Sequence, residues 1–208
     1  MNDYSFSQPS VSGVKRMASR IERTEETRTR IERAALEHFV EQGIAETSIR
    51  EIAETAGMSL GAMYNHFESK EELAWLLFIN GWNEIGTEMR RRANAESDLL
   101  GKMRAMIEYV FRRYDEDWML VTYIFSSRHH HLKRVPSSRG NPYMMFRLVI
   151  AEAMRSGEIP QGELDLKTAL IIGGIIQTID SRILARLKGP LANSAPAAAE
   201  LCVRMLGG

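Results

Sequence analysis

Apolar residues recur along this chain at the spacing of amphipathic helices. Ile31, Ala34, Ala35 and Phe39, together with His38, follow the i, i+3, i+4, i+7, i+8 pattern of one helix face. No segment shows the sustained alternation of apolar and polar residues that half-buried strands need. The pattern therefore predicts an all-α protein.

Helix-start signals mark two short helices and a long one in the first third of the chain. Ser48 to Glu51 form a capping box that opens a helix over 48–56. After the turn of residues 57–59, a second helix is expected over 60–67, and another capping box from Ser69 opens a long helix. Two helices joined by three residues have the spacing of a helix-turn-helix.

Longer helices are predicted for the rest of the chain. Met103, Ile107, Val110, Phe111 and Tyr114 belong to a heptad-like run after Asp98. Further helices are expected at about 118–132, from Asn141-Pro142 to Gly157, from Asp165 to about Leu187, and from Ser194 to Gly207.

Composition restricts the protein class without naming a partner. The 208 residues include 27 basic and 27 acidic ones, so a basic surface must be local. A single cysteine, Cys202, rules out an internal disulfide framework and fits a reducing cytoplasm. The longest apolar stretches fall short of the ~20 residues of a membrane-spanning helix, and residues 1–20 lack the apolar core of a secretory signal. We therefore expect a soluble, cytoplasmic protein with no membrane partner.

The helix predicted over 60–67 has an unusual surface. Leu60, Met63 and Phe67 form one narrow apolar stripe, which turns Gly61, Ala62, Tyr64 and Asn65 away from it. A face with few charges and little bulk allows a rigid surface to approach the backbone closely. The second helix of a helix-turn-helix enters the DNA major groove in this way. The alternative is a plain helical hairpin with a solvated face.

The segment TSIREIAETAGMSLGAMYNHFESKEEL resembles the DNA-binding domain of the TetR family of bacterial transcriptional regulators. The likeness is carried by the Thr47-Ser48 start, Ile52-Ala53, the turn 56–59, Tyr64, His66-Phe67 and Ser69-Lys70 before Leu73. It extends from about Arg23 to Phe78, and the remainder matches only in being helical and of similar length. The resemblance implies a homodimer on a palindromic operator, associated with the bacterial nucleoid when bound, and an effector-binding C-terminal domain.

The resemblance also implies residue roles and domain bounds. It implies a three-helix DNA-binding domain at 23–70 and an effector-binding and dimerisation domain at 71–208. Residues 1–22, which carry Lys15, Arg16 and Arg20, are expected from their composition to form a flexible basic arm. The implied phosphate contacts are Thr47, Ser48, Ser59, Tyr64, His66 and Lys70. The positions implied to face bases or allow close approach are Leu60, Gly61, Ala62 and Asn65. For His66, a packing role beneath the turn is the alternative.

Two positions depart from the family pattern. Family members often carry Lys, Arg or Thr where this chain has Leu60 and Ala62, so few side chains here donate to guanine. Specificity then falls on Asn65, on apolar contact with thymine methyl groups and on DNA shape.

The helix expected after Asp165 is apolar on more than one face, so it needs two partners. Gly173 and Gly174 allow another helix to come close. With the final helix, this segment is the predicted dimer interface, which includes Gly173, Gly174, Gln177 and Met205. A single deep core helix is the alternative.

His129, His130 and His131 are consecutive, and neighbours on a helix diverge by ~100°, so they cannot all bind one metal ion. We expect no metal site; one histidine should face inward and the others should be solvated beside Arg128, Lys133 and Arg134. That basic cluster could instead receive an anionic group of a ligand.

The effector pocket is expected among the middle helices. Its candidate lining is Met103, Ile107, Val110, Phe111, Trp118, Tyr123, Phe125 and Met145, although core packing explains these residues equally well. The effector is expected to be apolar or amphipathic; a long-chain acyl compound with an anionic head is one option.

Enzymatic motifs are missing from the sequence. No phosphate loop, dinucleotide fingerprint, metal-spaced His/Glu pair or Cys–His pairing occurs, so neither catalytic residues nor a cofactor are expected. The predicted function is a repressor that a small molecule releases from DNA. Control by a protein partner is the alternative.

Overall fold

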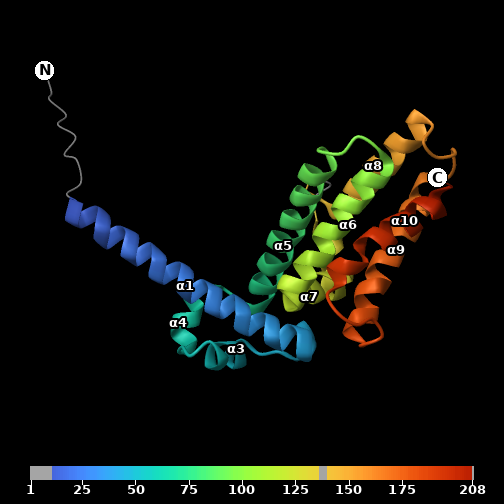
Figure 1. Cartoon of the computed structure of the whole chain (residues 1–208). Coiled ribbons are helices and arrows are strands. Elements are labelled where there is room, and N and C mark those ends of the chain that lie inside the picture. Colours follow the sequence, from blue (N-terminus) through green and yellow to red (C-terminus); the bar gives the residue numbers. More distant parts are fainter. Residues whose placement is uncertain (1–10, 136–139, 208) are drawn as a thin grey trace, which may run out of the picture. The chain divides into compact units, whose positions relative to one another are not determined.

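The computed structural model describes the backbone of residues 11–135 and 140–207, and the side chains of these ranges from residue 23 onwards. The described residues form helices and turns and no strand, which confirms the all-α prediction (Figure 1). The chain divides into two compact units, residues 1–73 and 74–208. No described helix combines the length and apolar character needed to cross a bilayer.

Within the residues that the structure describes, the first unit contains four helices and the start of a fifth. These are α1 (Val11–Glu41), α2 (Gly43–Glu46), α3 (Ile49–Thr55) and α4 (Leu60–Tyr64), followed by α5 (Lys70–Ala93). Because α1 begins at Val11, residues 11–22 are helical, whereas the sequence assigned them to a flexible arm; residues 1–10 of that arm lie outside the described residues. After Pro9 no proline interrupts the segment, and extending a formed helix costs far less than starting one.

The core of the first unit is the predicted apolar face of α1. Ile31, Ala35 and Phe39 are buried and α1 packs on α3, whose buried residues are Ile52 and Ala53. His38 is half-buried rather than part of this core, and its Nε2 lies 2.8 Å from the Thr55 hydroxyl. The first unit is therefore a small helical cluster held by α1.

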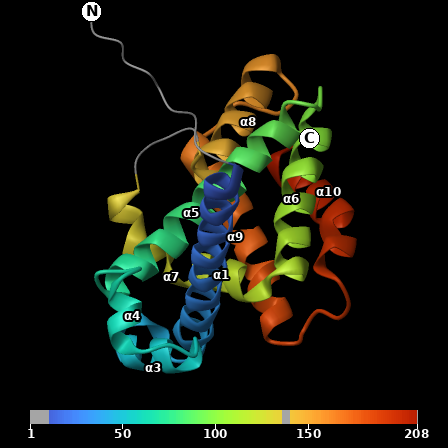
Figure 2. The ribbon, with the colours of Figure 1, turned by 90° about the vertical axis from the view of Figure 1, so that its left-hand side faces the viewer.

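The second unit contains the remaining helices. They are most of α5, then α6 (Leu99–Glu116), α7 (Trp118–His131), α8 (Pro142–Ser156), α9 (Leu164–Ile183) and α10 (Ala195–Leu206), with short 3-10 turns at Leu132–Arg134 and Leu191–Ser194. Helix α10 lies along α6, and α8 packs on α9 (Figure 2). Met103, Ile107 and Phe111 of α6 are fully buried at the centre of this unit.

In the first unit the helix predicted over 60–67 ends at Tyr64. Most predicted ends in the second unit agree with the structure, and α9 is the exception. Its cap is Glu163 rather than Asp165, because the Glu163 carboxylate accepts the N–H groups of Asp165 and Leu166. The helix ends at Ile183, four residues short of the predicted Leu187, because the chain turns at Ala185 with a φ of +55°. In contrast, Asn141 and Gly157 bound α8 as predicted.

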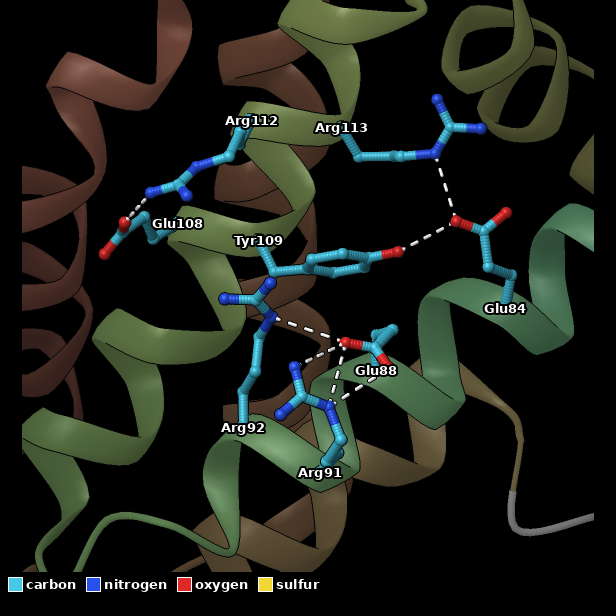
Figure 3. A network of polar contacts seen from close by, with 8 residues as sticks. All are labelled: Glu84, Glu88, Arg91, Arg92, Glu108, Tyr109, Arg112 and Arg113. Atoms are coloured by element: carbon cyan, nitrogen blue, oxygen red, sulfur yellow. Dashed lines mark hydrogen bonds and ion pairs between the residues drawn. The ribbon is translucent and has the colours of Figure 1, made fainter.

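A polar seam joins α5 to α6 (Figure 3). The Tyr109 hydroxyl donates to Glu84 Oε1 at 3.0 Å, and Arg113 Nε donates to the same oxygen at 3.1 Å. Two turns further along α5, the Arg92 guanidinium lies over the Tyr109 ring, 4.8 Å from its centroid. Burial and the Glu84 carboxylate raise the Tyr109 pKa above its usual range, so this phenol stays a donor. The seam fixes the rotation of α5 about its axis relative to α6.

The start of α5 is attached to α7 by a buried polar pair. The Tyr123 hydroxyl donates to the Ala74 carbonyl at 2.6 Å and lies 3.3 Å from His131 Nε2. The imidazole packs against the rings of Trp75 and Phe78 and is 1% exposed. Burial lowers the His131 pKa to about 4, so this side chain is neutral at pH 7.

Candidate DNA-binding surface and effector cavity

Local hydrogen bonds build the helix-turn-helix. Ser48 and Glu51 complete the predicted capping box at α3, with the Ser48 Oγ accepting from the Glu51 N–H and the Glu51 carboxylate accepting from the Ser48 N–H. Ser59 caps α4 by accepting the Ala62 N–H at 3.2 Å. Between the helices Gly57 adopts a φ of +68°, a conformation that glycine tolerates best. The turn and both helix starts are thus encoded within about fifteen residues.

The second capping box forms only in part. The Ser69 hydroxyl accepts the Glu72 N–H at 3.1 Å, as predicted. The Glu72 carboxylate, however, accepts the N–H of Glu68 at 2.6 Å, so the return bond goes to the residue before the cap. The start of α5 is therefore tied to the end of the α4 segment.

Helix α4 presents a surface with little charge. Tyr64 is 51% exposed, Leu60 is 39% exposed, and Asn65 is exposed at the helix end. A Cβ added at Gly61 would meet nothing within 4 Å, so the backbone is open to approach there. Met63 and Phe67 point the other way and are buried, whereas Leu60, predicted on the same stripe, is exposed. Ser48 and Ser59 are exposed beside this surface, and Ala62 is half-buried.

Two residues of the predicted phosphate-contact set are engaged inside the first unit. Thr47 is 1% exposed and its hydroxyl donates to the Gly43 carbonyl at 2.8 Å. The Lys70 ammonium donates to the carbonyls of Ala45 at 2.9 Å and Thr47 at 2.6 Å. The Thr47 hydroxyl therefore stabilises the α2–α3 connection from within, and Lys70 holds that connection against the start of α5.

His66 follows α4 and is half-buried. Its neighbour Phe67 is buried, with the Arg28 guanidinium of α1 5.2 Å from the ring centroid. The His66 ring makes no side-chain hydrogen bond within the described residues, so its position is compatible with packing and with phosphate contact.

A cavity of about 300 Å³ lies within the second unit. Residues of five helices and of the turn after α7 line it: Trp82, Ile85, Met89, Val110, Phe125, Arg128, Leu132, Asn141, Pro142, Tyr143, Phe146, Ile172, Ile175 and Ile176. Apolar side chains form most of the wall, and its few polar groups are on α7 and at the start of α8. A concave apolar site with a few polar groups is typical of small-molecule binding.

The cavity includes only two of the predicted lining residues, Val110 and Phe125. Five others are buried outside it, namely Met103, Ile107, Phe111, Tyr123 and Met145. Trp118 is 47% exposed and lines a separate hollow with Asp115 and Arg182. Sequence reasoning missed the α5 residues Trp82, Ile85 and Met89, although their i, i+3, i+7 spacing marks a buried stripe.

A close backbone contact positions one end of the cavity. A Cβ built on Gly86 of α5 would lie 2.0 Å from the Gly140 carbonyl oxygen, so only glycine fits there. Gly140 directly precedes the Asn141 cap of α8, whose Oδ1 accepts the Tyr143 N–H at 2.9 Å. The absent side chain at Gly86 therefore lets the start of α8, with Asn141 and Tyr143, lie against α5.

The predicted dimer residues lie on exposed parts of α9 and α10. Gly173, Gly174 and Gln177 are exposed, and a Cβ at either glycine would meet nothing within 4 Å. On the same face of α9, Leu166 and Leu170 are 57% and 56% exposed. On α10, Leu201 and Met205 are 63% and 59% exposed. The two helices contact one another, so the second unit exposes much apolar surface here.

The three histidines divide as predicted. His131 is buried, whereas His129 and His130 are exposed at the end of α7. Across the part of the chain that the structure describes, no group of three or more His, Cys, Asp or Glu side chains is arranged to hold a metal ion. Arg128 faces the cavity, and Arg134 instead lies over the Trp75 ring at 4.3 Å.

Comparison with known proteins identifies the family. Residues 31–74 match the family described as bacterial regulatory proteins, tetR family. The probable HTH-type transcriptional regulator ArpR of Pseudomonas putida is 32% identical over 162 residues, which are 72% of this chain and 76% of ArpR. The chain belongs to the TetR family. It is therefore a DNA-binding transcriptional regulator with a helix-turn-helix, as the sequence predicted.

Solved structures of TetR-family proteins share the fold of this chain. A TetR family regulator from Marinobacter aquaeolei VT8 superposes with a TM-score of 0.73 at 19% identity, covering 88% of this chain and 96% of that one. FadR of Bacillus subtilis, solved in complex with stearoyl-CoA, has a TM-score of 0.67 at 22% identity and covers 84% of this chain and 97% of its own. At these identities the likeness concerns the fold.

Proposed function

We propose that this TetR-family regulator is a repressor that binds a palindromic operator as a homodimer and is released by a small apolar or amphipathic effector. The observation that carries the DNA-binding half is the exposed face of α4, where Gly61, Tyr64 and Asn65 lie on a helix capped by Ser59. In this proposal residues 23–70 bind DNA, and residues 71–208 bind the effector and form the dimer.

The DNA contacts divide into two classes. Ser48, Ser59 and Tyr64 carry exposed hydroxyl groups suited to phosphate oxygens, and the start of α3 adds its free N–H groups. Asn65 is the side chain on this surface that can pair with an adenine edge, while Leu60 and Ala62 suit thymine methyl groups. Thr47 and Lys70 act indirectly, because their bonds to Gly43, Ala45 and Thr47 hold the α2–α3 connection in place.

The exposed apolar face of α9 and α10 supports the homodimer. Leu170, Leu201 and Met205 would be buried between two copies, and Gly174 would allow the two α9 helices to approach closely. Burying such side chains contributes roughly 25 cal/mol per Å² of apolar surface. A dimer also supplies the two recognition helices that a palindromic site requires.

The cavity favours a small-molecule effector over a protein partner. A completely filled second unit would have supported protein control, whereas a cavity of about 300 Å³ is present. FadR of Bacillus subtilis has the same fold and was solved in complex with stearoyl-CoA, which supports control by a small molecule.

A mobility-shift assay on the DNA upstream of the protein's own gene tests the proposal. Tyr64→Ala should weaken specific and non-specific binding alike, because phosphate contacts carry no sequence information. Tyr64→Phe keeps the ring and isolates the hydroxyl. Loss of discrimination at one base position alone would contradict the phosphate role.

Light scattering tests the dimer. Gly174→Asp should give a monomer that no longer shifts the operator, while Asn193→Asp, also at an exposed position, should remain a dimer. A Gly174→Asp protein that still runs as a dimer would refute this interface.

A further inference from the structure

The charged groups of the cavity wall are of one sign. Arg128 on α7 is the one ionisable cation among the described lining residues, and they include no Asp or Glu. The guanidinium donates to the Phe125 carbonyl on its own helix, and no carboxylate among the described residues pairs with it. Its remaining N–H groups are therefore left for a ligand or for water.

Two other polar side chains of the same cavity wall, Asn141 and Tyr143, can also donate hydrogen bonds. The Asn141 Oδ1 is occupied by the Tyr143 N–H, which leaves the amide NH₂ as the available end of that side chain. Tyr143 lines the same cavity and carries a hydroxyl donor. Asn141 caps the 15-residue helix α8 and Tyr143 lies in its first turn, so the helix dipole adds positive potential near both side chains.

The remaining wall is apolar and the space is small. Trp82, Phe125 and Phe146 contribute aromatic rings, and Ile85, Ile172, Ile175 and Ile176 contribute branched aliphatic surface. A volume of about 300 Å³ is at the lower end of the range for ligand pockets, roughly 300–1,000 Å³. Such a space suits one or two fused rings better than a long acyl chain.

We propose that the effector is a compact apolar anion, of the class of an aromatic carboxylic acid, with its carboxylate bound by Arg128 beside Asn141 and Tyr143. The inference rests on the proposed effector function of the cavity and narrows it. A cationic amphiphile would have to bring its charge beside Arg128 without a counter-ion, so the wall selects against that class. A neutral molecule of the same shape would lose the charge-assisted hydrogen bonds.

Isothermal titration calorimetry of the full-length dimer tests this with three probes of nearly equal shape: 2-naphthoate, 2-naphthamide and 2-naphthylmethylammonium. We expect naphthoate to bind at least about tenfold more tightly than the amide, and the ammonium ion not to bind. Stearate serves as the long-chain probe and should bind less tightly than naphthoate.

Variants of Arg128 test whether this side chain causes the preference for the carboxylate. Arg128→Gln should weaken naphthoate binding roughly tenfold or more and leave the amide within about threefold, whereas Arg128→Lys should recover part of the loss. Arg155→Gln removes an exposed arginine of α8 outside the cavity and should change neither probe. The comparison of probes on the wild-type protein remains decisive if a variant folds poorly.

The outcomes distinguish a failure of the anionic effector class from a failure of the effector role of the cavity. Equal binding of amide and carboxylate, tighter binding of the ammonium ion or of stearate, or naphthoate binding that is indifferent to Arg128→Gln would overturn the anion class while the cavity remains an effector site. If no probe binds and none releases the operator, the effector role of the cavity itself fails along with the anion.

Discussion

The helix-turn-helix and the cavity wall are held together in different ways. In the first unit the defining hydrogen bonds join residues three apart, as from Ser48 to Glu51 and from Ser59 to Ala62. The cavity wall instead brings together side chains from Trp82 on α5 to Ile176 on α9. A surface built from local bonds keeps its shape when one residue changes, whereas a wall built from distant segments depends on every contact between them.

The largest expected difference concerns two glycines, one in each region. Gly86→Ala should destabilise the second unit by about 3 kcal/mol, because the added Cβ meets the Gly140 carbonyl oxygen at 2.0 Å and backbone cannot yield cheaply. Gly61→Ala meets open space and should raise the helical stability of α4 by up to about 1 kcal/mol. Thermal unfolding, combined with hydrogen exchange resolved by segment, measures the stability change of each variant. Equal changes for the two variants would contradict the proposed difference between the cavity wall and the helix-turn-helix.

Acid should affect the second unit through His131. Its folded pKa of about 4 lies below the ordinary value of 6.5, so the unfolded state binds the proton more readily between these values. The stability that a neutral His131 contributes is fully present above about pH 6.5 and falls by about 3 kcal/mol as the pH decreases towards 4. His131→Phe should flatten this part of the profile, while His130→Phe, at an exposed position, should not.

The profile is measured by denaturant unfolding of the two variants and the wild type at several pH values. A wild-type profile that parallels His131→Phe would remove His131 as the cause.

The smallest effects concern the caps. Ser48→Ala and Asn141→Ala should each cost about 1 kcal/mol, since each removes a side-chain acceptor from the first turn of a helix. Hydrogen exchange should rise only in α3 for Ser48→Ala. For Asn141→Ala it should rise in α8 and around the cavity, because Asn141 belongs to the wall. If hydrogen exchange rose only in the capped helix for both variants, the contacts of the cavity wall would depend on one another less than we propose.

The same contrast explains what could be predicted from the sequence. The capping box at Ser48, the Asn141-Pro142 start and the Gly157 end are local signals, and all three are confirmed. The effector site was predicted largely on α6, yet Met103, Ile107 and Phe111 pack in the core. Amphipathic spacing shows that a helix face is buried, but which buried face borders an empty space depends on the neighbouring helices.

Lys70 shows a second limit of sequence reasoning. A lysine near a helix-turn-helix suggests a phosphate contact, whereas its ammonium group here donates to two carbonyls more than twenty residues earlier in the chain. The sequence grouped Arg128 with Lys133 and Arg134 in one basic cluster and did not distinguish among the three. Of these three, Arg128 is the one that lines the cavity.

The three tryptophans lie in different surroundings, so intrinsic fluorescence can report on separate parts of the molecule. Trp82 on α5 lines the cavity. Trp75, near the start of α5, packs against the His131 ring of α7, and Trp118, at the start of α7, is 47% exposed. Indole emission responds to the polarity and charge around the ring. With Trp118 replaced by phenylalanine, fluorescence would therefore report occupancy at Trp82 and the protonation of His131 at Trp75, without an attached dye.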